Sequence, residues 1–143
     1  MDTITLDIAA LGDPQQAGLE ELLTATFPTE PLDLLQVEVH RASSPRLGYG
    51  LVTVQDGQVV GAVLARQPRN GSVFVVYLAV AEPHRRRGIA CSLLDELTAA
   101  TGHRLELFVT DGNAAEHLYR DGGLAPDQGP APAGQRHWVG TWR

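Results

Sequence analysis

The fold is decided by one stretch of the chain, Val76-Tyr77-Leu78-Ala79-Val80-Ala81-Glu82-Pro83-His84-Arg85-Arg86-Arg87-Gly88-Ile89-Ala90. An apolar run typical of a strand stops at Pro83, crosses a basic turn and opens a helix. Such a junction aims unpaired backbone N–H groups and the positive end of the helix dipole at one point. Gly88 has no side chain to block close approach, and Ala90 is nearly as small. The stretch therefore predicts a pocket for an anionic phosphate.

Three strands are expected at and before this stretch, over residues 49–54, 59–65 and 73–81. Asp56-Gly57 separates the first two strands, and Asn70-Gly71 separates the second from the third. Both dipeptides are typical of two-residue hairpin turns. The pattern therefore predicts three consecutive antiparallel strands.

Helices are expected on the N-terminal side of these strands. Asp13-Pro14 supplies a cap and a first-turn proline, and apolar residues then recur at helical spacing until Pro28. These residues are Leu19, Leu22, Leu23 and Phe27. The following segment, residues 31–41, fits a helix through Leu32, Leu35 and Val39 or a strand through Leu35, Val37 and Val39, and we favour the helix.

A helical stripe follows the basic turn and ends at Gly102, and residues 104–109 then fit a strand. A strand, a helix and a strand in this order predict a right-handed crossover between two parallel strands. The basic turn then lies at the carboxyl end of the first strand, where ligands of open α/β sheets bind. Beyond it, a further helix is expected from about Asn113 to Gly122, a long loop over residues 125–135, and a final strand over residues 136–142.

Composition places the chain among ordinary globular proteins, since 43% of its 143 residues are hydrophobic and 20% are charged. Its longest apolar run, residues 73–81, is too short to span a membrane, and no basic and apolar leader is visible, so we expect a cytoplasmic protein with no membrane partner. The single cysteine, Cys91, excludes an internal disulfide and a multi-cysteine zinc site, and we expect no metal. The net charge of −6 argues against nucleic-acid binding.

All 11 basic residues are arginine. The absence of lysine excludes a Walker-type phosphate loop and a pyridoxal Schiff base, because both chemistries require a lysine. No G-x-G-x-x-G sequence follows a strand, so the dinucleotide-binding fingerprint is also missing.

Two motifs resemble those of the GNAT superfamily of acyl-CoA-dependent N-acyltransferases. Leu78-Ala79-Val80 followed by Arg85-Arg86-Arg87-Gly88-Ile89-Ala90 matches its Q/R-x-x-G-x-G/A pyrophosphate signature. Asn113, Tyr119 and Gly123 match its downstream N…Y…G pattern at the expected separation. The resemblance covers residues 49–124 well and both ends in outline, and it departs at Glu116, where the family more often has a small residue.

The resemblance implies a single α/β (α+β) domain over residues 1–143. Its expected form is a mixed, mostly antiparallel sheet of about six to seven strands with a parallel crossover and about four helices. It implies an acetyl-CoA-dependent N-acetyltransferase, in which a primary amine attacks the thioester directly within a ternary complex. The implied cofactor-binding residues are Leu78, Ala79, Val80, Arg85, Arg86, Arg87, Gly88, Ile89, Ala90 and Asn113.

Within this scheme the amides of residues 86–90 hold the pyrophosphate, and Leu78 and Val80 give backbone hydrogen bonds to the pantetheine arm. A backbone N–H near residues 78–80 stabilises the oxyanion, and Tyr119 supplies a proton to the departing thiolate. The implied acceptor is an amine on a small molecule or a peptide, and the family leaves room for a homodimer.

Several side chains also have plain structural interpretations. Cys91 fits a small buried residue better than a nucleophile, and Asn113 fits a helix cap as well as a cofactor contact. Tyr119 could be a half-buried aromatic residue, whereas Trp138 and Trp142 fit the core or an interface.

No carboxylate occurs on the expected strand before the basic turn, so a water chain, Glu30, Glu38 or His40 would have to act as a base. That absence keeps open a non-catalytic acyl-CoA sensor on the same fold. A basic-loop contact to nucleic acid is a further alternative, which the acidic charge disfavours.

Overall fold

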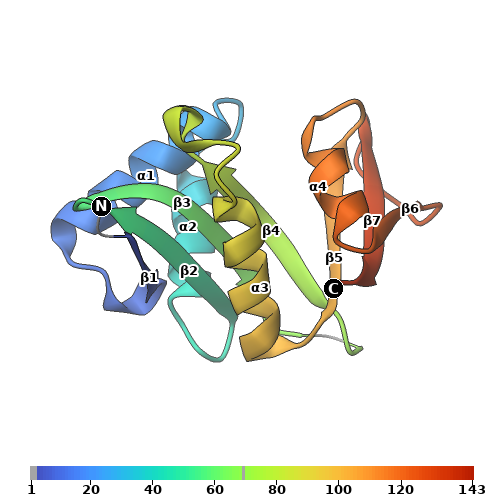
Figure 1. The fold of residues 1–143 in the computed structure, drawn as a ribbon, viewed down its shortest axis with the longest axis horizontal. Helices are drawn as coiled ribbons and strands as arrows, with labels where there is room; N and C mark the ends of the chain where they lie inside the picture. Colours follow the sequence, from blue (N-terminus) through green and yellow to red (C-terminus); the bar gives the residue numbers. More distant parts are fainter. Residues whose placement is uncertain (1–2, 69) are drawn as a thin grey trace.

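The computed structural model describes residues 3–68 and 70–143 and shows one mixed sheet with the strand order β1-β2-β3-β4-β5-β7-β6 (Figure 1). The strands are β1 (Thr3–Asp7), β2 (Gly48–Gln55), β3 (Gln58–Arg66), β4 (Val73–Val80), β5 (Arg104–Thr110), β6 (Leu124–Asp127) and β7 (Gln135–Thr141). The helices are α1 (Asp13–Thr26), α2 (Leu32–Ala42), α3 (Ile89–Thr101) and α4 (Ala115–Asp121), with short 3₁₀ turns at η1 (Ile8–Ala10) and η2 (Glu82–His84). The expected GNAT-like fold class is confirmed.

The meander β2-β3-β4 forms as its turn residues predict. Asp56 and Gly57 have φ values of 51° and 82°, and Asn70 and Gly71 have φ values of 52° and 79°. These left-handed pairs are the conformation of a type I′ turn, whose twist matches that of the strands it joins. Asp56 and Gly57 form the whole β2–β3 turn, whereas Asn70 and Gly71 are part of a longer connection between Arg66 and Val73.

The two faces of the sheet are covered by different helices. Helices α1 and α2 pack against one face of β1–β4 in a cluster that includes Leu23, Leu35 and Tyr77. Helix α3 packs on the opposite face through Leu93, Leu94 and Leu97. We call these the α1/α2 face and the α3 face; Figure 1 shows α3 in front of the sheet and α1 and α2 behind it.

Strand β4 carries one extra residue relative to β3. Val75 pairs with Ala65 and Tyr77 with Leu64, so Val76 is left without a partner across the ladder. Because of this bulge, Val75 packs on the α3 face whereas Tyr77, two residues later, packs on the α1/α2 face. The bulge also bends the strand that bears it.

Strands β4 and β5 are parallel, as predicted, but they pair only at Val73 with Leu105 and Phe74 with Glu106. Beyond these pairs the strands spread apart, and Figure 1 shows the divergence clearly. It divides the sheet into an N-terminal arm, β1–β4, and a C-terminal arm, β5–β7. The family resemblance implies such a splay.

Two strands were not located by the sequence patterns. The segment expected as a loop over residues 125–135 begins with β6, which pairs with β7 and lies at the edge of the sheet. The expectation failed because Pro126 lowers strand propensity but is tolerated in an edge strand. At the opposite edge, β1 pairs antiparallel with β2.

The end of the chain closes the C-terminal arm. The backbone N–H of Trp142 donates to the carbonyl of His103 at 2.6 Å, and that of Arg143 donates to Gly122 at 2.8 Å. A Cβ added at Gly122 would lie 2.1 Å from the Trp142 ring, so glycine is required there for the indole to enter the core. Trp138 and Trp142 are both buried, in agreement with their expected core role.

No helix within residues 3–68 and 70–143 has the length and apolar character needed to cross a bilayer.

Candidate functional site

The basic loop lies at the carboxyl end of β4, in the position predicted from the sequence. After η2, Arg86 and Gly88 adopt left-handed conformations with φ values of 65° and 79°, and Gly88 is the N-cap of α3. Left-handed backbone favours glycine because it has no Cβ. The loop therefore turns sharply enough to present the start of α3 toward the end of β4.

The amides of this loop are available to a ligand. The first backbone hydrogen bond of α3 runs from Ser92 N–H to the Gly88 carbonyl at 3.0 Å. Within the described residues, the N–H groups of positions 86–91 have no protein acceptor. A Cβ added at Gly88 would meet no atom within 4 Å, so the space over this residue is open. Free donors around open space at a helix start form an anion site, which fits a pyrophosphate.

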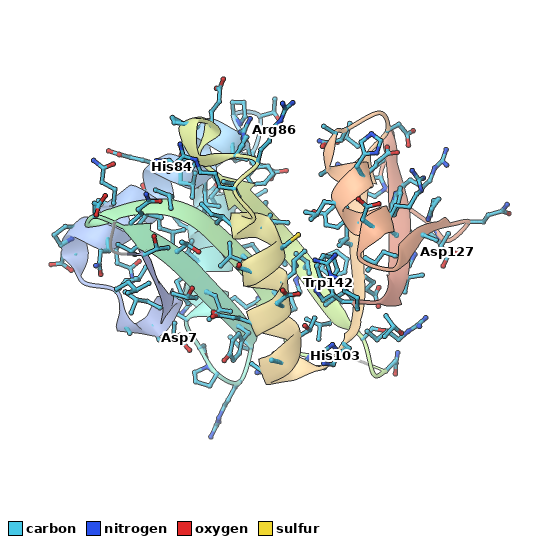
Figure 2. All side chains as sticks on the ribbon, viewed as in Figure 1. Asp7, His84, Arg86, His103, Asp127 and Trp142 are labelled. Carbon is cyan, nitrogen blue, oxygen red and sulfur yellow. The ribbon has the colours of Figure 1, made fainter. Side chains whose placement is uncertain are left out.

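The loop side chains surround this site. Arg85, Arg86 and Arg87 are all exposed, and Arg85 Nε donates to the Val80 carbonyl at 3.0 Å. Figure 2 shows His84 and Arg86 in the loop beyond the N-terminal end of α3. Arg85 thus tethers the loop to the end of β4, and all three arginines add positive charge beside the free amides.

The edge of β4 beyond the divergence faces away from β3. The Ala81 N–H donates to the Val60 carbonyl at 2.8 Å, and Ala79 pairs with Ala62. Backbone groups alternate in direction along an antiparallel strand, so those of Leu78 and Val80 point toward the open side. On that side the Val80 carbonyl accepts from Arg85 Nε, and the backbone groups of Ala79 face β3 instead. The contacts of Leu78 and Val80 with a pantetheine arm stay predictions.

Close packing between α3 and the sheet depends on a residue that the motifs did not identify. A Cβ added at Gly61 of β3 would lie 2.7 Å from Ile89 Cγ2 and 3.3 Å from Leu93 Cδ1. Gly61 pairs with Val80, so its missing side chain lets the first turn of α3 approach the strand that carries the open edge. The only sequence signal was an isolated glycine inside a strand pattern.

The remaining predicted residues lie on the C-terminal arm, across the divergence. Asn113 Oδ1 accepts a hydrogen bond from Ala115 N–H at 2.8 Å, and Glu116 Oε2 accepts one from Gly112 N–H at 2.9 Å. Both side chains therefore organise the start of α4. The predicted capping role of Asn113 is present, and Glu116 stabilises the turn before it.

Tyr119 of α4 is 6% exposed, and its ring centroid lies 6.5 Å from that of Trp138. Burial raises the pKa of the Tyr119 phenol to about 12, because the ionised form would lose its hydration. The hydroxyl therefore keeps its proton at neutral pH. That property is what a donor to a thiolate requires, although burial alone also explains it.

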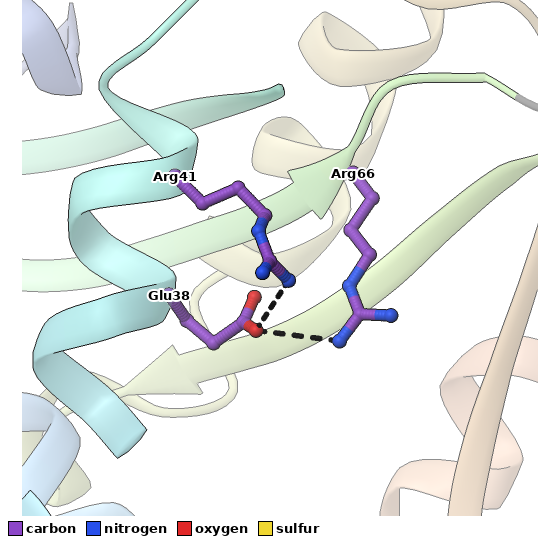
Figure 3. A network of polar contacts seen from close by, with 3 residues as sticks. All are labelled: Glu38, Arg41 and Arg66. Carbon is purple, nitrogen blue, oxygen red and sulfur yellow. Dashed lines mark hydrogen bonds and ion pairs between the residues drawn. The ribbon is translucent and has the colours of Figure 1, made fainter. Parts of the chain in front are cut away.

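The candidate bases differ in their surroundings. Glu38 Oε1 lies 3.0 Å from Arg41 Nη1 and 3.3 Å from Arg66 Nη2, so its charge is already shared by two guanidinium groups (Figure 3). His40 is exposed on α2 and lines a cavity of about 500 Å³ between α1 and α2. Neither residue is placed as an unengaged base beside β4.

A second cavity, of about 490 Å³, lies between α1 and the β2–β3 turn and includes Glu21, Glu82 and Arg85. It reaches the basic loop from the α1/α2 face and does not contain Gly88. Among the described residues, no group of three His, Cys, Asp or Glu side chains could hold a metal ion.

Known structures show the same fold. PaiA N-acetyltransferase from Thermoplasma acidophilum in complex with coenzyme A is 13% identical to this chain, with a TM-score of 0.78 over 99% of this chain and 100% of that one. NAA60 from Arabidopsis thaliana in complex with a bisubstrate analogue is 17% identical, with a TM-score of 0.75 over 99% and 100%. The NatC complex bound to Gag peptide and CoA contains a chain that is 16% identical, with a TM-score of 0.76 over 100% of both chains.

No curated protein matches this sequence. The sequence model described as "Acetyltransferase (GNAT) family" matches residues 16–123, a span that runs from α1 to the end of α4 and includes the basic loop, Asn113, Tyr119 and Gly123. The chain therefore belongs to the GNAT family of acetyltransferases.

Proposed function

We propose that this chain, acting as one domain over residues 1–143, is an N-acetyltransferase that transfers an acetyl group from acetyl-CoA to a primary amine. The observation that carries the proposal is the juxtaposition of free loop amides, open space over Gly88 and an unpaired β4 edge. Each feature suits one part of coenzyme A: the first two suit the pyrophosphate, and the third suits the peptide-like pantetheine arm. Structures of PaiA and NatC with bound coenzyme support this assignment.

In the proposed reaction, the neutral amine nitrogen attacks the thioester carbonyl carbon, the C–N bond forms, and the C–S bond then breaks. Backbone N–H groups near residues 78–80 stabilise the oxyanion. The departing sulfur takes a proton from Tyr119, which regains one from water, and the nitrogen releases its own proton to solvent. The sum is amide, free thiol and one proton released from the starting ammonium.

The loop and the β4 edge contribute chiefly by positioning. Holding the thioester and the amine in one complex replaces a bimolecular encounter with an oriented one. The peptide in the NatC structure and the bisubstrate analogue in the NAA60 structure support an acceptor of the amine class. On the sequence grounds given above, we propose that the protein acts in the cytoplasm without binding nucleic acid.

A coenzyme-binding sensor without catalytic activity is the second candidate. The observation that favours it is the lack of a carboxylate on β4, together with the pairing of Glu38 to two arginines. Calorimetry with acetyl-CoA, free CoA and a short oligonucleotide separates these functions. Binding of either coenzyme and not of the oligonucleotide is expected, and failure to bind either coenzyme would contradict both candidates.

If the coenzyme binds, release of free thiol in the presence of an amine panel separates the enzyme from the sensor. The enzyme requires thiol release that depends on the amine and yields the acetylated amine by mass spectrometry. Coenzyme binding with no turnover across a broad panel would favour the sensor.

A further inference from the structure

Four aromatic rings lie in two pairs on the α1/α2 face, on both sides of the β4–β5 divergence. Phe27 and Tyr77 have ring centroids 4.8 Å apart, and Phe74 and Phe108 form an edge-to-face pair at 5.4 Å. Phe108 alternates along β5 with residues packed on the α3 face, so its ring points to the α1/α2 face. No helix covers this face of the C-terminal arm in Figure 1.

Two of the rings, Phe108 and Phe74, are accessible from outside the protein, whereas Tyr77 is buried. Phe108 is 38% exposed, which is unusual for a large aromatic ring on a central strand, and Phe74 is partly exposed. Phe74 pairs with Glu106 at the last position where β4 and β5 meet, and Tyr77 directly follows the bulge. An apolar surface therefore borders the place where the acyl group is proposed to lie.

The carboxylate of Glu38, near these rings, is already paired with two guanidinium groups. Arg66 places its guanidinium 5.5 Å from the Phe74 ring centroid and also contacts Glu38, which Arg41 contacts too (Figure 3). Because two guanidinium groups already contact Glu38, its carboxylate is not available to a further cation.

On the other side of the rings, His137 lies between two carboxylates. Its Nε2 is 3.3 Å from Glu106 Oε1, and its Nδ1 is 3.4 Å from Asp127 Oδ2. The His137 ring also contacts Phe108, at 5.8 Å between centroids. Both carboxylates are thus directed at the imidazole.

Glu30, between α1 and α2, differs from these acids. Among the described residues, no basic group lies within 4.0 Å of its carboxylate. Its backbone N–H donates to the Phe27 carbonyl at 3.1 Å, which places Glu30 beside that aromatic pair. Its negative charge and its hydrogen bond with the Tyr77 hydroxyl help to raise the phenol pKa to about 12, after the larger effect of burial. Glu30 is therefore a carboxylate beside the aromatic rings that contacts no basic group among the described residues.

We infer that the acyl acceptor is a primary amine with one positive charge and a hydrophobic group close to it. This inference rests on the proposed function and names the acceptor class. The hydrophobic group packs on Phe74 and Phe108, while the ammonium approaches Glu30 before it loses its proton. The acceptor is assigned one positive charge because Glu30, unlike Glu38, Glu106 and Asp127, contacts no basic group among the described residues.

Two sources supply this chemistry, an arylalkylamine or a peptide whose first residue is apolar. Calorimetry on the protein saturated with CoA compares phenethylamine, ethylamine, spermidine and a tetrapeptide with an N-terminal leucine. Phenethylamine or the peptide should bind at least about tenfold more tightly than ethylamine, the factor expected for burying one apolar group. Which of the two binds more tightly identifies the source. Tighter binding of spermidine than of both would overturn the inference.

Variants of Phe108 and Glu30 test where the amine binds. Phe108→Ala should weaken phenethylamine binding by about tenfold and leave ethylamine binding unchanged, because only the first ligand carries a ring. Phe108→Leu should retain most of the affinity, and Ile4→Ala is the control, because Ile4 is an exposed apolar residue on β1, far from β5 in the sheet. Glu30→Gln should weaken the binding of both phenethylamine and ethylamine. Equal losses for both amines in Phe108→Ala would overturn the inference.

Transfer is measured separately, as thiol released from acetyl-CoA. Selective amine binding without thiol release would support the acceptor class and contradict the proposed activity. Thiol release with spermidine alone would support the activity and contradict the acceptor class.

Discussion

The indole Nε1 of Trp142 donates a hydrogen bond to Asp95 Oδ1 at 2.7 Å. Asp95 lies on α3, which packs against the N-terminal arm, whereas Trp142 follows β7 in the C-terminal arm; Figure 2 shows the indole between them. Since β4 and β5 share only two residue pairs, this bond adds a polar connection between the arms to the apolar core that spans both. It fixes the C-terminal arm relative to the helix that begins at Gly88.

Removing this connection should destabilise the fold. Asp95→Ala deprives a buried indole N–H of a charged acceptor, so the free energy of unfolding should fall by about 1–3 kcal/mol. Urea unfolding followed by tryptophan fluorescence measures the change. Glu96→Ala, the exposed neighbour on α3, is the control and should change the value by less than about 0.5 kcal/mol. Equal effects of the two variants would show that the bond contributes nothing.

Gly88→Glu should abolish coenzyme binding, because it puts bulk and negative charge where the pyrophosphate is proposed to sit. The left-handed backbone also adds strain of about 1–2 kcal/mol. Gly71→Glu is a matched control: it has the same φ of 79° and the same open surroundings, but lies in the β3–β4 turn. Calorimetry with acetyl-CoA should show loss only in the first variant. Full affinity in a folded Gly88→Glu protein would contradict the proposed pocket.

Tyr119→Phe should lower kcat by about 100-fold while the KM for acetyl-CoA stays nearly constant, since the hydroxyl is proposed to act only on the departing sulfur. Tyr49→Phe, which removes a hydroxyl from a partly buried tyrosine packed against the same core, serves as the control. Steady-state kinetics with a responsive amine provides both constants. An unchanged kcat would remove Tyr119 from the mechanism and leave it a packing role.

Stability should decline in alkaline solution. The folded-state pKa values of Tyr77 and Tyr119 are raised from 10.0 to about 12, so the folded protein holds these protons more tightly than the unfolded chain. The resulting stabilisation is complete below pH 10 and is lost as the pH rises toward 12. For the more deeply buried Tyr119 it is on the order of 2–3 kcal/mol, at about 1.4 kcal/mol per pH unit. Urea unfolding between pH 9 and pH 11.5 should show the decline, and Tyr119→Phe should flatten it.

Local signals were sufficient for much of the fold. Asp56-Gly57 and Asn70-Gly71 specify their turns by backbone conformation, and the apolar stripe before Gly102 specifies a helix, because these effects act within a few residues. The position of the basic loop between β4 and α3 was predictable for the same reason. The segment that became α2 fitted two periods, and its packing against α1 and the sheet selected the helix.

Long-range relationships could not be read in this way. The need for glycine at position 61 comes from Ile89, which is far away in the sequence, and the open edge of β4 depends on how β5 is placed. The aromatic surface required three elements to bring Phe27, Phe74 and Phe108 to one face. The spacing of these residues within each element does not indicate that they share one face.

The extra residue in β4, Val76, can be tested by deletion. Deleting Val76 would leave Val75 and Tyr77 on their present faces, because the two already occupy successive positions opposite β3. The strand would lose its bend and the packing of the partly buried Val76 against the α1/α2-face core, and β4 could then continue its ladder with β5. Such a deletion should preserve or raise the free energy of unfolding while coenzyme affinity collapses. On this view, one extra residue keeps β4 from pairing further with β5, and coenzyme binding depends on that missing pairing. A strand shorter by one residue would give a more continuous sheet that binds the coenzyme less well.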